Sequence, residues 1–200
     1  NNKRAGDNAT MVRARANFLS GGYYMPIADY VADVLSEVLA HRDREKKNGA
    51  FARPFIVDAG SGTGWYSIQA AGSVHGALVF GIDTSKHAVD IASRAARRAG
   101  LLGSCVFAVA SLSHMPLPDG CADAILSLFA PLDVSEFARV IAPGGYLLVG
   151  SSGARHLFGL KKILYDEPVE NTPLKVDGGS YFNVIRRENI SFAITVSGED

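Results

Sequence analysis

Three glycines at every second position follow a short apolar stretch, and no other feature constrains the fold of this chain as strongly. The apolar stretch is Pro54-Phe55-Ile56-Val57, and the segment after it is Asp58-Ala59-Gly60-Ser61-Gly62-Thr63-Gly64. Glycine has no Cβ, so the backbone here can turn sharply and pass close to a ligand. A buried strand, a glycine-rich turn and a following helix are typical of α/β proteins that bind nucleotides.

Two details separate this loop from the fingerprint of dinucleotide-binding proteins. The spacing is G-x-G-x-G, and Trp65 occupies the position where G-x-G-x-x-G requires its third glycine. Asp58 lies at the strand end, beside the position of a pyrophosphate, and two anions in one pocket repel each other. S-adenosylmethionine instead carries a sulfonium and an ammonium group beside one carboxylate. We therefore expect the loop to bind S-adenosylmethionine rather than NAD.

Strand and helix patterns alternate from residue 55 to residue 150. We expect five strands and three helices in the order strand 55–59, helix 65–72, strand 78–83, helix 85–99, strand 104–110, strand 122–128, helix 134–141 and strand 146–150. This alternation predicts an α/β fold with a Rossmann-like, doubly wound and mostly parallel sheet. Further on, Tyr181–Ile185 and Ile190–Val196 flank a polar tetrapeptide, which predicts an antiparallel C-terminal hairpin.

The composition fits a single soluble domain in the cytoplasm. The 200 residues are 48% hydrophobic, and 20 basic residues balance 20 acidic ones, so net charge gives no global attraction to nucleic acid or membrane. No apolar run approaches the roughly 20 residues that cross a bilayer. The two cysteines, Cys105 and Cys121, have apolar surroundings, which favours reduced thiols over a disulfide. No Cys/His cluster has metal-ligand spacing.

Ligands of open α/β sheets bind outside the carboxyl ends of the strands, and three residues are expected there. Asp83 ends the second strand, where it can accept both ribose hydroxyls; its alternative role is a helix N-cap. Ser111 ends the third strand, near the expected adenine, or it only forms a turn. Phe129 follows the fourth strand and can stack on a methyl-accepting base, or it is a core aromatic.

Several segments resemble the bacterial large-subunit (23S) ribosomal RNA guanine-N1 methyltransferases. The more specific ones are Met11 through Arg15, Gly22-Tyr23-Tyr24-Met25-Pro26 and Arg155-His156-Leu157. The glycine-loop match, Asp58 through Tyr66, is generic to the methyltransferase superfamily. Further matches are Gly81 through Lys86, Phe129-Ala130-Pro131 and Pro143-Gly144-Gly145. The resemblance extends to around residue 167. It implies a class I methyltransferase that uses S-adenosylmethionine to methylate N1 of a guanine in a 23S rRNA hairpin.

The resemblance also implies site residues and a domain arrangement. The residues that bind the cofactor in this family correspond to Tyr24, Gly62, Thr63 and His156, beside Asp83. With the loop interpretation added, the predicted cofactor-binding residues are Tyr24, Asp58, Gly60, Gly62, Thr63, Gly64, Asp83, Ser111 and His156. Residues 1–50 are expected to form a helical segment that packs on the cofactor site, and residues 51–200 the methyltransferase domain, within one structural domain.

Ribosomal RNA is the predicted partner, with a small-molecule acceptor as the alternative. The predicted substrate contacts are Arg13, Arg15, Phe129, Lys161 and Lys162, since cationic side chains can meet phosphates. The family carries an N-terminal zinc ribbon, and this sequence looks like a central fragment without it, so zinc is expected only in that ribbon. A general base is not identified, no membrane partner is expected, and a homodimer stays open as an assembly state.

Overall fold

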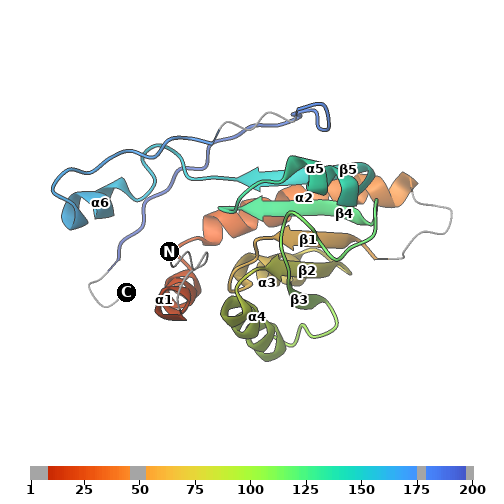
Figure 1. Cartoon of the computed structure of the whole chain (residues 1–200), viewed down its shortest axis with the longest axis horizontal. Helices are drawn as coiled ribbons and strands as arrows, with labels where there is room; N and C mark the ends of the chain where they lie inside the picture. The colour runs from red at the N-terminus through yellow and green to blue at the C-terminus, as the bar shows by residue number, and fades with distance from the viewer. Residues whose placement is uncertain (1–8, 46–52, 175–178, 197–200) are drawn as a thin grey trace.

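The fold is built on one sheet of five parallel strands in the order β3-β2-β1-β4-β5. The computed structural model describes residues 9–45, 53–174 and 179–196. The strands are β1 Phe55–Ala59, β2 Leu78–Asp83, β3 Cys105–Val109, β4 Ala122–Leu128 and β5 Ile141–Gly150 (Figure 1). The strand order reverses direction between β1 and β4, and ligands bind beside such a switch point. The predicted α/β class is confirmed.

The helices of the described residues cover both faces of the sheet. They are α1 Ala9–Ser20, α2 Met25–Glu45, α3 Trp65–Ser73, α4 Lys86–Arg98, α5 Val134–Val140 and α6 Phe158–Leu164. Residues of α2, α3 and α4 share one core cluster, and residues of α5 belong to the other. Within these described residues, no helix combines the length and hydrophobicity that a membrane span requires. The predicted boundary between residues 50 and 51 lies outside the described part of the chain.

The sheet separates the two apolar clusters. Leu35, Ala70 and Leu126 belong to the cluster under α2 and α3, while Val57 and Phe137 belong to the cluster under α5. Every position of β4 is buried because helices cover this central strand on both sides. Its sequence is accordingly a continuous, mainly apolar run without polar alternation, as parallel strands require.

The predicted C-terminal hairpin is wrong. Residues 181–196 contain no strand, and in Figure 1 the blue C-terminal trace stays outside the sheet. The segment is held by separate side-chain contacts: Phe182 packs on the core, Phe192 packs on Tyr24, and Arg186 pairs with Glu37 at 2.7 Å. Two strands alone are marginally stable, and the polar connection lacks an Asn-Gly or Asp-Gly turn.

Two further elements differ from the expectation. The β5 strand begins at Ile141, ahead of the expected start at residue 146, and includes Pro143-Gly144-Gly145. A register irregularity accommodates these residues, because Ala122 pairs with Ile141 but Ala124 pairs with Tyr146. The short helix α6 was not predicted, and it begins after Leu157, whose φ of 54° lies in the left-handed region.

Candidate functional site

The glycine loop between β1 and α3 is shaped by contacts that exclude larger residues. Gly60 and Gly64 have φ values of 86° and 76°, which L side chains rarely adopt. A Cβ added to Gly60 would lie 2.5 Å from the Cβ of Ala130, and one added to Gly64 would lie 2.6 Å from the Phe107 ring. The alternating glycines therefore let the loop pass between its neighbours at the end of the sheet.

Asp83, at the end of β2, links this loop to the next helix. The Gly62 N–H donates to Asp83 Oδ2 at 2.9 Å, and the Ser85 N–H donates to Oδ1 at 2.8 Å. The α4 N-cap is Ser85, whose hydroxyl accepts from the Ala88 N–H at 3.2 Å. Asp83 is therefore not the helix cap, and two backbone N–H groups fix its carboxylate in place.

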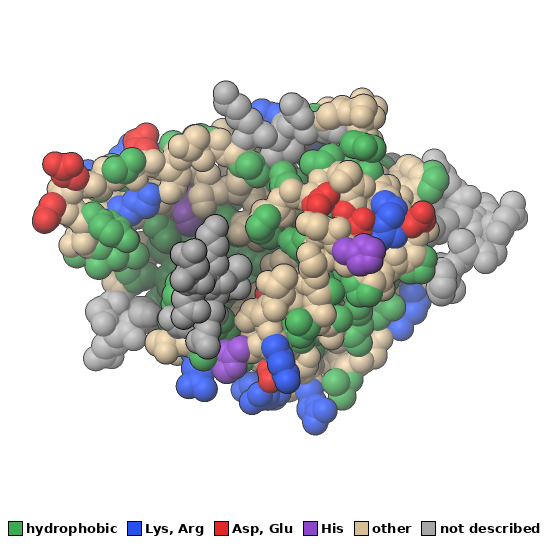
Figure 2. All heavy atoms as spheres, viewed as in Figure 1, with side chains coloured by type: hydrophobic (Ala, Val, Ile, Leu, Met, Phe, Trp, Pro, Cys, Tyr) green, Lys and Arg blue, Asp and Glu red, His purple; other side chains and the backbone are tan. Residues whose placement is uncertain are grey.

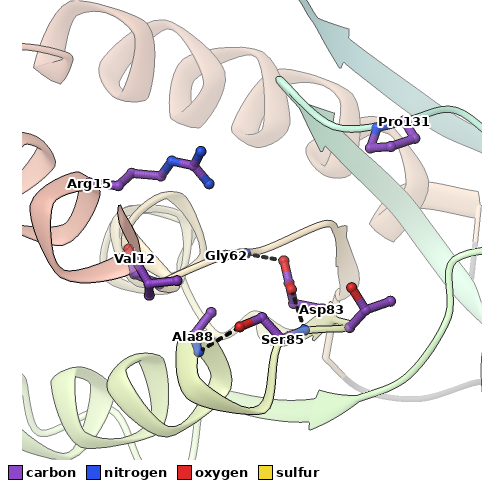
Figure 3. Close-up of a pocket in the computed structure, with 9 residues that line it drawn as sticks. Val12, Arg15, Gly62, Asp83, Ser85, Ala88 and Pro131 are labelled. Carbon is purple, nitrogen blue, oxygen red and sulfur yellow. Dashed lines mark hydrogen bonds between the residues drawn. The ribbon is translucent and has the colours of Figure 1, made fainter. Parts of the chain in front are cut away.

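Two adjoining cavities meet at Asp83. The larger, of about 340 Å³, is lined by Val12, Arg15, Gly62, Thr63, Asp83, Thr84, Ser85, Ala88 and Pro131. The smaller, of about 250 Å³, is lined by Gly60, Asp83, Thr84, Ser111, Leu112, Ser113 and Pro131. Because Asp83, Thr84 and Pro131 line both, the two form one crevice beside the carboxyl ends of the strands. Figure 3 shows Val12 and Arg15 reaching this crevice from α1, while Asp83 and Ser85 come from the β2 end.

An aromatic cluster lies beyond the end of β4. The Tyr24 hydroxyl is hydrogen-bonded to His156 Nε2 at 2.6 Å, and the His156 ring stacks on Phe129 with centroids 5.8 Å apart. Burial, assisted by the charge of Lys161, lowers the pKa of His156 and so favours its neutral ring. Phe129 has a φ of 57°, a backbone strain of the kind found at functional sites. Figure 2 shows hydrophobic side chains lining a hollow in the viewed face, with a histidine beside it.

Asp58 lies behind the crevice, in the interior. Its side chain is 2% exposed, accepts a hydrogen bond from the Ser67 hydroxyl, and lines neither cavity. Burial raises the pKa of Asp58 to about 6, and the nearby Asp83 charge adds to this rise. A positively charged ligand near this end of the sheet would favour the ionised Asp58 carboxylate. Cofactor binding by Asp58 stays a prediction.

The basic residues assigned to RNA occupy two regions of the structure. Arg13 and Arg15 are exposed on α1, whereas Lys161 and Lys162 belong to α6. Of these four residues, Arg15 alone lines the crevice. Lys161 donates to the Val169 carbonyl and to Asn171 Oδ1, so part of its hydrogen-bonding capacity is used internally. The Lys162 ammonium lies 5.4 Å from the Phe158 ring centre.

The predicted cofactor residues are divided between the crevice and its surroundings. Gly60, Gly62, Thr63, Asp83 and Ser111 line the crevice. Tyr24 and His156 belong instead to the aromatic cluster. The prediction missed seven crevice-lining residues, which are Val12, Thr84, Ser85, Ala88, Leu112, Ser113 and Pro131. All of them except Val12 lie within a few residues after an expected strand, so a wider window around each strand end would have included them. Among the described residues, no three His, Cys, Asp or Glu side chains form a metal site.

Comparison with protein families identifies the domain. The family described as "Methyltransferase domain" matches residues 56–145, from β1 into β5. Residues 56–145 are therefore similar to a methyltransferase domain. The 23S rRNA (guanine(748)-N(1))-methyltransferase of Streptomyces fradiae is 35% identical over 155 residues, covering 78% of this chain and 50% of that protein. A Micromonospora griseorubida protein assigned to the 23S rRNA guanine-N1 methyltransferases is 34% identical over 158 residues, covering 78% and 52%.

These relatives confirm the resemblance drawn from the sequence. The chain spans about half the length of each of them. Solved structures agree on the fold. A Methanococcus maripaludis protein assigned to the S-adenosylmethionine-dependent methyltransferases superposes with a TM-score of 0.55 at 20% identity, covering 76% of this chain and 67% of that one. A geranyl diphosphate methyltransferase superposes with a TM-score of 0.50 at 21% identity, covering 74% and 56%. The class I methyltransferase fold is thus confirmed.

Proposed function

We propose that this chain is the cofactor-binding part of an enzyme that methylates N1 of a guanine in 23S rRNA, with S-adenosylmethionine as methyl donor. The observation that carries the proposal is the Asp83 carboxylate, which two backbone N–H groups hold in the wall shared by both cavities. The Streptomyces fradiae relative, named for guanine-N1 methylation of 23S rRNA, supports the choice of acceptor.

The crevice fits the adenosine half of the donor. Each Asp83 oxygen accepts one backbone N–H and has a further lone pair, so the carboxylate can also accept the two ribose hydroxyls. The smaller cavity, between the glycine loop and Ser111–Ser113, suits a flat purine. The acid at this wall disfavours a diphosphate, because two anions in one site repel each other. When bound, the donor supplies a methyl group activated by a sulfonium centre.

The aromatic cluster fits the acceptor end of the reaction. Phe129 is 41% exposed although it packs on Tyr24, Tyr66 and His156, so part of this residue stays accessible to a base. Guanine N1 is buried in Watson–Crick pairs, so the base must leave its stack before its N1 can reach the methyl group. The ring faces of Tyr24 and Phe129 also favour a nearby cation such as a sulfonium. The N1–methyl bond forms as the methyl–sulfur bond breaks, which leaves S-adenosylhomocysteine, and the N1 proton passes to water or to a base. The protein accelerates this transfer mainly by aligning acceptor and donor.

The basic side chains are proposed to hold the RNA. Arg13 and Arg15 on α1, with Lys161 and Lys162 on α6, can meet the phosphates of an rRNA hairpin. Contacts of this kind release counterions, so RNA affinity falls as salt rises.

Methylation of RNA in vitro tests the proposal. The protein is incubated with methyl-labelled S-adenosylmethionine and 23S rRNA, and the product is mapped by primer extension, since a methyl group on N1 blocks base pairing. We expect one strong stop at a hairpin guanine, and a weaker one with Asp83→Ala at limiting cofactor concentration. Label on another atom or on no RNA, despite measurable cofactor binding, would contradict the proposed acceptor and favour a small-molecule substrate.

A further inference from the structure

The loop between β3 and β4 forms one wall of the smaller cavity. Ser111, Leu112 and Ser113 line that cavity, and Leu112 also belongs to the core cluster under α5. Apart from an isolated bridge between Ser111 and His114, residues 110–121 make no strand pairing and no helix. The sheet therefore does not hold the far side of this loop, and another contact must fix the wall.

The Arg139 guanidinium of α5 supplies that contact. Nη2 donates to the Met115 carbonyl at 3.1 Å, and Nη1 donates to the Leu117 carbonyl at 2.8 Å. Nη1 also donates to Asp119 Oδ1 at 2.6 Å. Nε and Nη2 donate to the two Glu136 carboxylate oxygens at 2.9 and 2.6 Å. These five bonds use all five N–H donors of an arginine.

Glu136 completes the connection from the other side. Its Oε1 accepts the Met115 N–H at 2.7 Å, so Met115 is held through both its N–H and its carbonyl. Met115 is 2% exposed and anchors the loop in the core. Hydrogen bonding to Arg139 lowers the pKa of Glu136, so the pair stays ionised at neutral pH. A lysine has three donors on one atom and cannot reproduce the planar fork.

We propose that the Glu136–Arg139 pair positions the β3–β4 loop for adenine and thereby sets the preference of the site for a 6-aminopurine. The inference rests on the proposed function, since it takes the donor to be an adenosine derivative. The Ser111 hydroxyl accepts the Ser113 N–H at 3.2 Å, and the Ser111 carbonyl accepts the His114 N–H at 3.4 Å. Recognition of the base edge is therefore assigned to other backbone groups of the loop. Discrimination by such groups depends on their position, because a misplaced polar group loses its hydrogen bond.

Two ligands that differ only at the base edge test the inference. S-inosylhomocysteine carries a 6-oxo group and an N1 proton where S-adenosylhomocysteine carries a 6-amino group and a bare N1. We expect calorimetry to show that the wild-type chain prefers the adenine ligand by at least about tenfold. In Arg139→Lys the preference should fall below about threefold, mostly through weaker binding of the adenine ligand.

Matched variants separate positioning from general support of the fold. Arg94→Ala removes another arginine with a carboxylate partner, Asp90 at 3.7 Å. Arg94 is exposed on α4 and lines neither cavity, so this variant should keep the wild-type preference. Glu136→Gln and Asp119→Ala remove parts of the same network and should lower the preference even if Arg139→Lys does not fold. An unchanged preference in those variants, or an equal loss for both ligands, overturns the inference. A wild-type chain that binds neither ligand overturns the proposed function, and the inference with it.

Discussion

Asp83 concentrates the interactions of the site on one side chain. Its oxygens hold the Gly62 N–H of the glycine loop and the Ser85 N–H at the start of α4, and both cavities open beside it. The carboxylate therefore orders the loop and faces the space proposed for the ribose. Both roles depend on its charge and on its two acceptor atoms.

Replacement of Asp83 by alanine is expected to weaken S-adenosylhomocysteine binding by about 1–3 kcal/mol, because charge-assisted hydrogen bonds are lost. Isothermal titration calorimetry measures the change. Asp90→Ala serves as the control, since Asp90 is half exposed on α4 and lines neither cavity. Equal affinities in wild type and Asp83→Ala would remove Asp83 from the binding site.

The sequence predicted some site residues well and others poorly. Asp83 and the glycines were identifiable because strand, loop and spacing all point to the same edge of the sheet. Val12 and Arg15 reach the crevice from α1, which lies far from the loop in sequence. The Tyr24–His156 bond joins residues 132 positions apart, and no periodic pattern encodes such a contact.

Among the elements of the fold, the glycine loop tolerates little change. It follows β1, turns beneath Ala130 and leads into α3 through Gly64 in the left-handed region. Main-chain hydrogen bonds also hold the loop to β2, because the Gly60 and Ser61 N–H groups both donate to the Ile82 carbonyl.

Gly60→Ala is expected to destabilise the fold by about 1–3 kcal/mol, because alanine would have to adopt a positive φ and contact Ala130. Urea unfolding measures this free energy. Gly72→Ala is the matched control: Gly72 lies in α3 with no atom near its added Cβ, and alanine favours helix by up to about 1 kcal/mol. A Gly60→Ala protein as stable as wild type would mean that the loop is not constrained as described.

The sequence predicted elements best where burial alone determines them. The bounds of β1, β2 and β4 agree with the expectation because each is a mainly apolar run. The β1 strand ends before Gly60 and β2 ends at Asp83, while β4 is followed by Phe129 in the left-handed region. The C-terminal hairpin was predicted from residues of high strand propensity, but those side chains make isolated contacts outside the sheet. Propensity alone does not reveal whether a neighbouring strand is available for pairing.

At the scale of the whole molecule, the buried Asp58 links stability to pH. Its raised pKa means that the folded chain binds the Asp58 proton more tightly than the unfolded chain does. The protonated Asp58 carboxyl therefore contributes to the free energy of unfolding at low pH, and this contribution is lost as pH rises from about 4 to about 6. A rise of about two pH units in the pKa corresponds to a cost on the order of 3 kcal/mol at pH 7.

Asp58→Asn removes this titration, so its free energy of unfolding should decline less than that of wild type between about pH 4 and pH 6. Denaturant unfolding at several pH values measures the difference. Asp90→Asn, a change at an exposed carboxylate, should follow the wild-type curve. Parallel curves for wild type and Asp58→Asn would show that Asp58 does not titrate in this range.

A crystal structure of the chain grown with S-adenosylhomocysteine shows whether the crevice at Asp83 holds an S-adenosyl ligand. We expect electron density for the ribose hydroxyls against the Asp83 carboxylate and for the base beside Ser111–Ser113. An empty crevice at saturating ligand, or a ligand bound elsewhere on the chain, would contradict it.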